Sequence, residues 1–468
     1  MQSRLTAAVR RAASVLRSRS LLAACLLTAV PAIAWAHVSL VATTPARDAV
    51  VDEAPPELRL VFSGTIERRY TSITLLAPDG SGVPVGAVEF VAGSDREFTV
   101  AMPPVTAPGT YTVQWRTAGA DGHVLEGSYT FVLAGDTTGT AADTLPPVAA
   151  PVHTDHDHHM EDAAAAGLDV RPIAARWLHF LALVLLTGGL AFRALLLPRL
   201  LLAEDLRRDL VRRTWRIVAA AALLLGVAAV LRLWLQSVAL HGADRAWNSA
   251  LLSIMLTDTG WGRAWLFQAF LFAILGAGIM YAQPLRDRAA LVIAAIAALG
   301  LSAIPALTGH AAGAGGLAWL VVLNDTAHVV AAGAWLGTLA MVMFVLVPGL
   351  RRGRGTPAGS IADAVDRFSP QALIAAGVLV ATGGINALMH FSEPAQLFGT
   401  DYGRALLVKL AVFGLVLLAG FYNWRVTRPR LAAGTDDGRR LRVSAGLELG
   451  FAAVVLLATA VLTGLARP

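Results

Sequence analysis

The chain has 468 residues, of which 56% are hydrophobic and 15% are charged, and its mean hydropathy is +0.61. This composition excludes an ordinary soluble protein, in which about 25% of residues are charged, and it predicts a membrane protein. The formal net charge is +6, but the arginines lie in short segments between apolar runs, which argues against a nucleic-acid-binding surface.

Residues 1–36 have the pattern of a secretory signal peptide. Five arginines precede the apolar run 21–33, which ends at the small-residue cleavage site Ala34-Trp35-Ala36. Cleavage after Ala36 would give His37 a free α-amine; lipidation at Cys25 is the alternative. Cys25 is the only cysteine, so the predicted mature chain has no thiolate, and a metal site must use histidine, methionine, carboxylate or backbone ligands.

Residues 37–135 predict a small exported β domain of about seven strands. Apolar alternation and turn residues place strands at 57–62, 72–76, 97–100, 109–116 and 127–133. Tyr111, Val113 and Trp115 share one face of their strand and polar residues share the other, as in a strand with one buried face. We therefore expect an all-β sandwich or barrel, Ig-like with Greek-key connections.

The loop before the last predicted strand contains Asp121, Gly122 and His123. Taken alone, this pattern is better explained by an aspartate and a histidine that satisfy each other within a loop. Together with the amine and imidazole of His37, they make a nitrogen-rich ligand set of the kind that suits Cu(II).

The β region resembles the periplasmic copper-binding CopC family. The resemblance rests on His37-Val38-Ser39-Leu40, Thr44-Pro45, Trp115-Arg116 and Asp121-Gly122-His123. It implies that His37, through its amine and ring, binds Cu(II) together with His123 and Asp121, in the arrangement called a histidine brace. Some members of the family also have a methionine-rich loop for Cu(I). Met102 is the only methionine of this region, which argues against a second site.

Residues 136–172 predict a flexible linker rich in threonine, glycine, alanine and proline. It contains a patch of acids interspersed with His153, His156, His158 and His159. Such a composition binds divalent metals. A solvated linker with adventitious binding is an equal alternative, and zinc or nickel would suit the patch as well as copper.

Residues 173–468 predict an all-α bundle of about eight transmembrane helices. The apolar runs lie at 173–196, 216–240, 263–282, 289–308, 321–347, 369–389, 404–424 and 444–465. Arginines concentrate after the odd-numbered runs, and the positive-inside rule places those loops in the cytoplasm. The β domain and the C-terminus are then expected outside the cytoplasm.

On this topology the histidines of the membrane region all lie toward the outer side. They are His179, His241, His310, His328 and His390. Water-satisfied interfacial histidines are the alternative explanation for those at the ends of spans. Asp325 precedes His328 by three residues on the same helical face, so this carboxylate is expected to orient the imidazole or to bind metal itself.

The membrane region resembles the CopD family of inner-membrane copper proteins over nearly all of 173–468. The matching motifs are Gly309-His310-Ala311, Asp325-x-x-His328-x-x-x-x-Gly333-x-Trp335-x-Gly337, and Tyr402-Gly403-Arg404 with Lys409. The resemblance implies copper uptake or transfer into the cell.

We therefore expect a copper-binding protein of the bacterial inner membrane that is not an enzyme. The β domain would capture Cu(II), and the membrane domain would receive copper, as Cu(I) or Cu(II), at its outer histidines and pass it inward. Its expected partners are the copper ion, the lipid bilayer and periplasmic copper proteins. The alternatives are a membrane oxidoreductase with haem between His179 and His328, and copper sensing or sequestration without flux.

Overall fold

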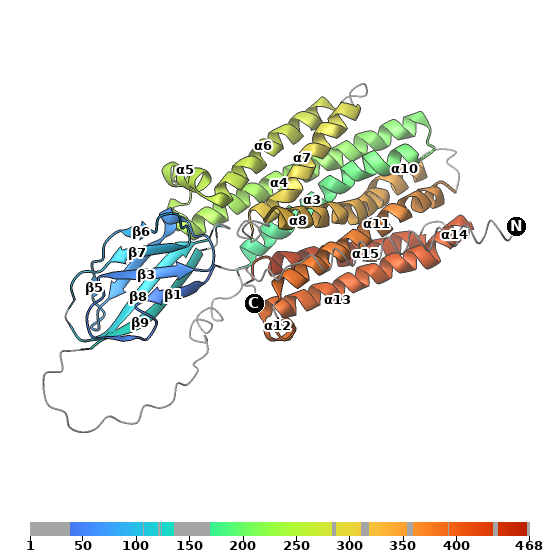
Figure 1. Cartoon of the computed structure of the whole chain (residues 1–468). Coiled ribbons are helices and arrows are strands. Elements are labelled where there is room, and N and C mark those ends of the chain that lie inside the picture. Colours follow the sequence, from blue (N-terminus) through green and yellow to red (C-terminus); the bar gives the residue numbers. More distant parts are fainter. Residues whose placement is uncertain are drawn as a thin grey trace, which may run out of the picture.

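The computed structural model describes residues 38–105, 107–119, 122, 124–134, 169–282, 287–309, 318–352, 359–391, 393–433 and 439–465. Within these ranges a β domain lies against one end of a bundle of long helices (Figure 1). We call this end of the bundle the β-domain end and the opposite end the far end. The predicted signal peptide, His37 and the histidine patch of the predicted linker lie outside the described residues.

The β domain is a sandwich of two sheets, as expected. One sheet has the order β1-β3-β7-β6 and the other the order β2-β9-β8-β4-β5. The strands are β1 (Leu40–Thr44), β2 (Val50–Val51), β3 (Glu57–Phe62), β4 (Ser72–Leu76), β5 (Gly82–Val83), β6 (Val88–Phe90), β7 (Glu97–Ala101), β8 (Gly109–Ala118) and β9 (Val124–Leu133). The short helix η1 (Arg68–Tyr70) precedes β4.

The sequence pattern predicted β3, β4, β7, β8 and β9 but not the four strands at the sheet edges. None of β1, β2, β5 and β6 contains a fully buried residue. An edge strand with little burial needs no strict apolar alternation, so periodicity does not detect it.

The core of the sandwich lies between the two sheets. Leu60 of β3 pairs with Phe98 of β7, and both side chains are buried. From the other sheet, the rings of Tyr111 and Phe131 stack with centroids 5.4 Å apart. Val113 is also buried while its neighbours Thr112 and Gln114 are not, which confirms the predicted two-faced strand.

Eight helical segments among the described residues are long and apolar enough to span a membrane, as predicted. Their main helices are α3 (Val170–Ala191), α4 (Glu204–His241), α6 (Gly260–Tyr281), α7 (Asp287–Leu307), α8 (Ala318–Ala332), α11 (Gly359–His390), α13 (Asp401–Tyr422) and α15 (Arg439–Leu462). Short helices extend or connect them: η2 (Phe192–Leu196), η3 (Leu197–Arg199), η4 (Ala243–Arg245), α5 (Ser249–Asp258), η7 (Gly333–Gly337), α9 (Thr338–Met341), η8 (Val342–Leu346), α10 (Val347–Arg352), α12 (Gln396–Gly399), η9 (Asn423–Thr427) and α14 (Arg428–Ala432).

The helix α4 is longer than the apolar run 216–240 that predicted it. Its first turns are polar and carry pairs three or four residues apart, including Arg208 with Glu204 and Arg213 with Asp209. Such pairs support an exposed helix. The apolar run therefore marked the part that suits a bilayer rather than the whole helix.

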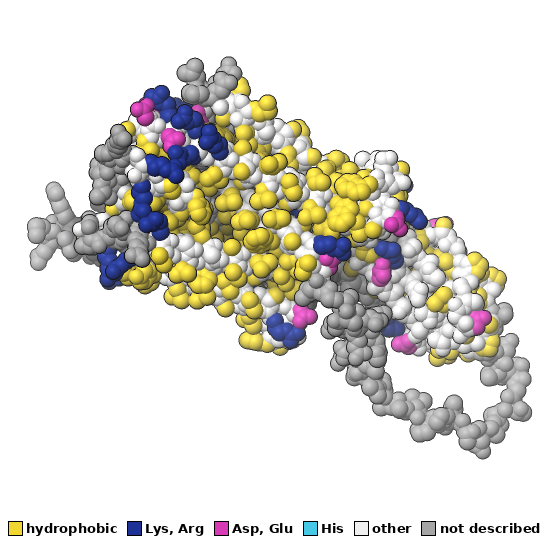
Figure 2. All heavy atoms as spheres, turned by 180° about the vertical axis from the view of Figure 1, so that it is seen from behind, with side chains coloured by type: hydrophobic (Ala, Val, Ile, Leu, Met, Phe, Trp, Pro, Cys, Tyr) yellow, Lys and Arg dark blue, Asp and Glu magenta, His cyan; other side chains and the backbone are white. Residues whose placement is uncertain are grey.

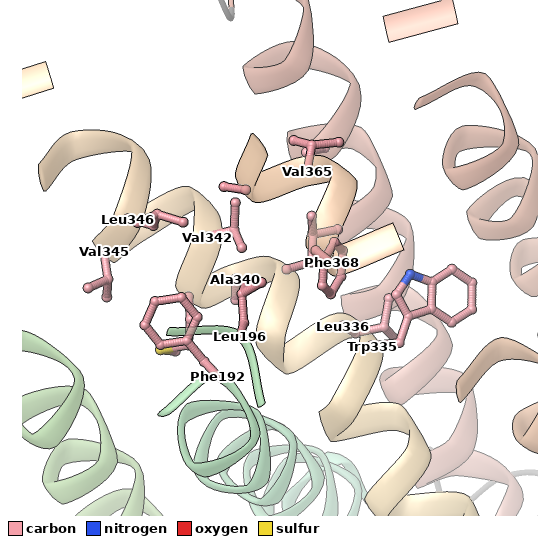
Figure 3. Close-up of a cluster of buried hydrophobic side chains, with 14 of the residues drawn as sticks. Phe192, Leu196, Trp335, Leu336, Ala340, Val342, Val345, Leu346, Val365 and Phe368 are labelled. Atoms are coloured by element: carbon pink, nitrogen blue, oxygen red, sulfur yellow. The ribbon is translucent and has the colours of Figure 1, made fainter. Parts of the chain in front are cut away.

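The centre of the bundle forms where α3 crosses the fifth span at glycines. A Cβ atom on Gly188 or Gly337 would overlap the backbone of the other segment. Small residues permit such close helix contact in membranes. Buried side chains that include Phe192, Leu336 and Phe368 pack around this crossing toward the far end (Figure 3).

The surface of the bundle is an apolar band with arginines gathered at the far end (Figure 2). Arginines described at this end include Arg199, Arg208, Arg212, Arg351, Arg352, Arg430 and Arg440. This distribution matches the arginine asymmetry seen in the sequence.

Candidate functional site

The β domain contacts the bundle through the segment around η1. The backbone N–H of Gly260, the first residue of α6, donates to Glu67 Oε1 at 2.9 Å. Arg69 forms an ion pair with Asp258 at 2.8 Å. A carboxylate at a helix N-terminus is favourable because the unpaired N–H groups there carry partial positive charge. The two contacts tie η1 to α5 and α6.

Burial changes the titration of two β-domain side chains that lie at this interface. It raises the pKa of Glu67, and this effect is partly offset by the hydrogen bond from Gly260 and by Arg263. Burial, with the nearby Glu67 and Asp258 carboxylates, also raises the pKa of Tyr70 to about 12. The phenol of Tyr70 is therefore neutral at physiological pH.

His241 lies at this interface, at the end of α4. Its Nε2 is 3.2 Å from the Tyr70 hydroxyl, and its Nδ1 is 3.1 Å from the Ser237 hydroxyl. Both ring nitrogens are thus engaged by hydrogen-bonding groups. His241 acts here as a contact between the domains, and a metal ion would have to displace Tyr70 or Ser237 to bind it.

The hairpin between β8 and β9 also rests on the bundle. The side-chain amide of Gln236 on α4 donates to the carbonyl of Gly122 at 2.5 Å, and Gly122 faces Trp261 of α6. Its φ of +81° favours glycine. From the same hairpin, Arg116 donates to the carbonyl of Ala239 at 3.2 Å.

Gly122 is the central residue of the predicted ligand loop. Asp121 and His123, on either side of it, lie outside the described residues, as does His37. The structure therefore places the backbone between two predicted ligands against α4 and α6, and the coordination of metal by these residues stays a prediction.

A second polar group lies inside the bundle between α8 and α11. Nδ1 of His328 is 2.8 Å from the Thr382 hydroxyl. That hydroxyl is also 2.7 Å from the carbonyl of Val378, to which it donates its single hydrogen. The tautomer that fits this bond has the ring hydrogen on Nδ1 of His328 and a lone pair on Nε2. No hydrogen bond to Nε2 is formed by the described residues, so His328 can offer this nitrogen to a metal ion.

Asp325 lies one turn before His328 and accepts a hydrogen bond from Asn386 at 2.7 Å. Asn324 in turn donates to Asn386 Oδ1 at 2.7 Å. Asn386 thus contacts Asp325, and Thr382 contacts His328; both partners lie on α11. The expectation that Asp325 orients the imidazole or binds metal itself stays a prediction.

Lys409 of α13 adds a cation to this group. It interacts electrostatically with Asp325 and with His328, and it is the only lysine in the whole sequence. A single ammonium inside a span faces a carboxylate, as intramembrane charges usually do. We call Asn324, Asp325, His328, Thr382, Asn386 and Lys409 the α8–α11 polar group.

His179 lies apart from these contacts, on α3. It is 2% exposed, and neither ring nitrogen has a hydrogen-bond partner among the described residues. It interacts electrostatically with Arg232, whose guanidinium donates to Thr308 at 3.0 Å. A buried imidazole with both nitrogens unpaired is unusual, so His179 remains available to a ligand.

The remaining predicted ligands are not placed by the structure. His310 and the linker residues His153, His156, His158 and His159 lie outside the described residues, and so does the side chain of His390 at the end of α11. Within the described ranges, no three His, Cys, Asp or Glu side chains lie close enough together to hold a metal ion. A complete outer cluster would therefore need His310 or His390.

Sequence reasoning missed the residues that join the two domains. Glu67, Arg69 and Gln236 carry no motif, and α5 is too short to register as a span. Thr382 had a detectable signal, because it lies four residues before Asn386 and therefore shares a face of α11 with it.

Three family models match separate parts of the chain. Residues 40–134 match the CopC domain, residues 168–320 match the Copper resistance protein D-like, N-terminal domain, and residues 362–462 match Copper resistance protein D. Together they cover both the β domain and most of the helical bundle.

Similar proteins cover both parts. Copper transport protein CutJ of Bacillus subtilis (strain 168) is 27% identical over 446 residues, which are 94% of this chain and 76% of that protein. Copper resistance protein D of Pseudomonas syringae pv. tomato is 30% identical over 51% of this chain and 80% of its own length. The crystal structure of CopC from Methylosinus trichosporium OB3b is 31% identical, covers 22% of this chain and all of that chain, and has a TM-score of 0.21.

Proposed function

Since the chain belongs to the CopC and CopD families, joined in one polypeptide, we propose that it captures copper with its β domain and transfers the ion across the inner membrane. The similar proteins named above include a copper transport protein and a copper resistance protein. The capture site, the route and the direction belong to the proposal.

We assign the capture step to a Cu(II) site formed by His37, Asp121 and His123. An amine, two imidazoles and a carboxylate suit the tetragonal geometry of Cu(II). The proposal is supported by the docking of Gly122 on Gln236 at 2.5 Å, because this contact holds the residue between two proposed ligands at the β-domain end of the bundle. This is the observation that carries the proposed function.

The route inside the bundle is assigned to His328 and Asp325 on α8 and to His179 on α3. His328 lies ten residues into α8, about 15 Å along the helix, and His179 lies nine residues into α3, at about 14 Å. Both are therefore at a similar depth from the β-domain end. The free Nε2 of His328 provides the first ligand, and His310 and His390 are proposed to supply others.

The orientation follows from the arginines at the far end (Figure 2). By the positive-inside rule this end faces the cytoplasm, so the β domain lies on the periplasmic side. Copper captured outside would then enter the bundle at the β-domain end, and transfer is directed inward.

Copper flux into proteoliposomes tests the route. Purified protein that begins at His37 is reconstituted into vesicles with the β domain outside. Luminal copper is measured after Cu(II) or Cu(I) is added. We expect wild-type protein to fill the vesicles and His328→Ala to lose this flux while keeping the Cu(II) EPR signal of the β domain. The matched control is Ser302→Ala, because Ser302 is buried on α7 and bonds only within its helix, to Ala298, among the described residues.

The outcomes separate the alternatives. Equal luminal copper with wild-type protein and His328→Ala would refute the assigned route. Copper that stays bound to the protein without entering the vesicles would indicate sequestration. A Soret band in the spectrum of the purified protein would instead indicate the haem-binding oxidoreductase.

A further inference from the structure

A carboxylate is buried in the half of the bundle near the far end, away from the α8–α11 polar group. Glu448 of α15 is 2% exposed. It lies nine residues from the start of α15, about 14 Å along the helix. An ionisable group in this position is costly in a membrane and usually has a function, and the proposed copper route does not use it.

Each oxygen of this carboxylate accepts a hydrogen bond from a neutral donor. Trp335 Nε1 donates to Glu448 Oε1 at 3.0 Å, and Asn423 Nδ2 donates to Oε2 at 2.8 Å. The hydroxyl of Ser444 contacts Asn423 Oδ1, which fixes the orientation of the amide. The two donors hold the carboxyl group in place without supplying a charge to neutralise it.

The two donors come from irregular turns of their helices. Trp335 lies in the π-helical turn η7 (Gly333–Gly337), and Asn423 begins the π-helical turn η9 (Asn423–Thr427). Such turns are rare and often occur at functional sites. Two separate helices thus deviate from α-helical geometry at the residues that contact Glu448.

No ion pair among the described residues involves Glu448. The elements packed against α15 are α13, α3, η9 and α9, and η7 supplies Trp335. The charged or titratable residues of these elements and of α15 itself are Arg171, Arg176, His179, Asp401, Tyr402, Arg404, Lys409, Tyr422, Arg425, Arg439, Arg440 and Arg442. Arg176 donates instead to the carbonyl of Ala460, twelve residues further along α15.

A groove lies beside this cluster on the surface of the bundle. It has a volume of about 680 Å³ and runs between α13 and α15, with Tyr422, Arg440 and Ser444 in its wall. Ser444 lines the groove and also contacts the amide that holds Glu448. Ser444 therefore lies between the groove and Asn423, which donates to Glu448.

We propose that Glu448 is a proton-binding site, which takes up and releases one proton as copper moves through the bundle. The proton binds one carboxylate oxygen and leaves to water, and no other bond changes. A bound proton removes the uncompensated charge of the buried carboxylate. The site stands on its own contacts, whereas its link to copper movement rests on the proposed function.

Trp335 connects the two parts of this proposal. It lies seven residues beyond His328 on the same span, about 10 Å along the helix. A shift of this segment when copper binds His328 would move the indole that donates to Glu448. Proton release would then accompany the inward step.

Infrared difference spectroscopy tests the site without copper. When the pH of the protein in lipid is lowered, the spectrum should gain the carbonyl band of a protonated carboxylic acid. Glu448→Gln should lack this band, and Glu448→Asp should retain it at a shifted frequency. The control is Glu393→Gln, because Glu393 is exposed. Identical spectra for wild-type protein and Glu448→Gln would overturn the proposal.

Proton movement in proteoliposomes tests the coupling. Wild-type copper entry should change the luminal pH, whereas Glu448→Gln should lose this pH change. An equal pH change in both proteins would refute the coupling. If wild-type protein carries no copper at all, the proposed function fails, while the infrared band still decides whether Glu448 binds a proton.

Discussion

Substitutions of Glu67 should show how docking of the β domain depends on charge and on pH. Glu67 is half-buried and accepts a hydrogen bond from Gly260 at 2.9 Å. Its pKa is raised because burial opposes the charged form more than Gly260 and Arg263 favour it. Glu67→Gln keeps an oxygen for the Gly260 N–H and removes the charge, so we expect it to dock more tightly than wild type at neutral pH.

A comparison of two neutral variants isolates the contribution of the hydrogen bond from Gly260. Glu67→Gln and Glu67→Ala are both neutral, and they differ chiefly in the bond to Gly260. Such a bond contributes about 0.5–1.5 kcal/mol net, so the docking constants of the two variants should differ by about 2- to 13-fold. The ion pair between Arg69 and Asp258, being largely exposed, should contribute less than about 1 kcal/mol.

The dependence on pH follows from the direction of the shift. A carboxyl whose pKa is higher in the docked than in the undocked state binds protons preferentially when docked. Docking of the wild-type protein should therefore strengthen as pH falls from the raised pKa of Glu67 toward the ordinary value of 4.5. The difference between wild type and Glu67→Gln isolates Glu67, because Asp258 and His241 are common to both.

Distances between two spin labels measure the docked fraction. The predicted mature chain has no cysteine, so labels can be attached to cysteines that replace Glu89 on β6 and Asp205 on α4, both exposed. The docked state should give one narrow distance peak. The reasoning would be refuted if Glu67→Gln undocked as readily as Glu67→Ala, or if its pH dependence equalled that of wild type.

Three further substitutions or insertions test the fold and the capture site. Gly337→Ala should destabilise the bundle by about 1–3 kcal/mol through overlap with α3, measured by thermal unfolding. Gly384→Ala should not lower stability, because a Cβ atom added there meets no other atom within 4 Å. Leu60→Ala, at a fully buried position, should destabilise the β domain by about 2–5 kcal/mol; a loss in urea unfolding well below this range would contradict the assigned core. One residue added before His37 should abolish the Cu(II) EPR signal, and unchanged binding would disprove the brace.

Part of the candidate site was predictable from single segments. Asp325 and His328 were found because one helical turn separates them. The partner of His328 was not predictable, because Thr382 lies 54 residues away. The engagement of His241 by Tyr70 depends likewise on contact between two domains.

The sequence by itself determined the two-part architecture, the eight spans and the strands of the β-domain core. These features depend on local periodicity and on the length of apolar runs, which act within one segment. Only the tertiary structure decided that Gly122 rests on Gln236 and Trp261, and that Trp335 and Asn423 converge on Glu448. Such contacts join residues far apart in the chain, and burial makes each polar group depend on a partner that its own segment does not contain.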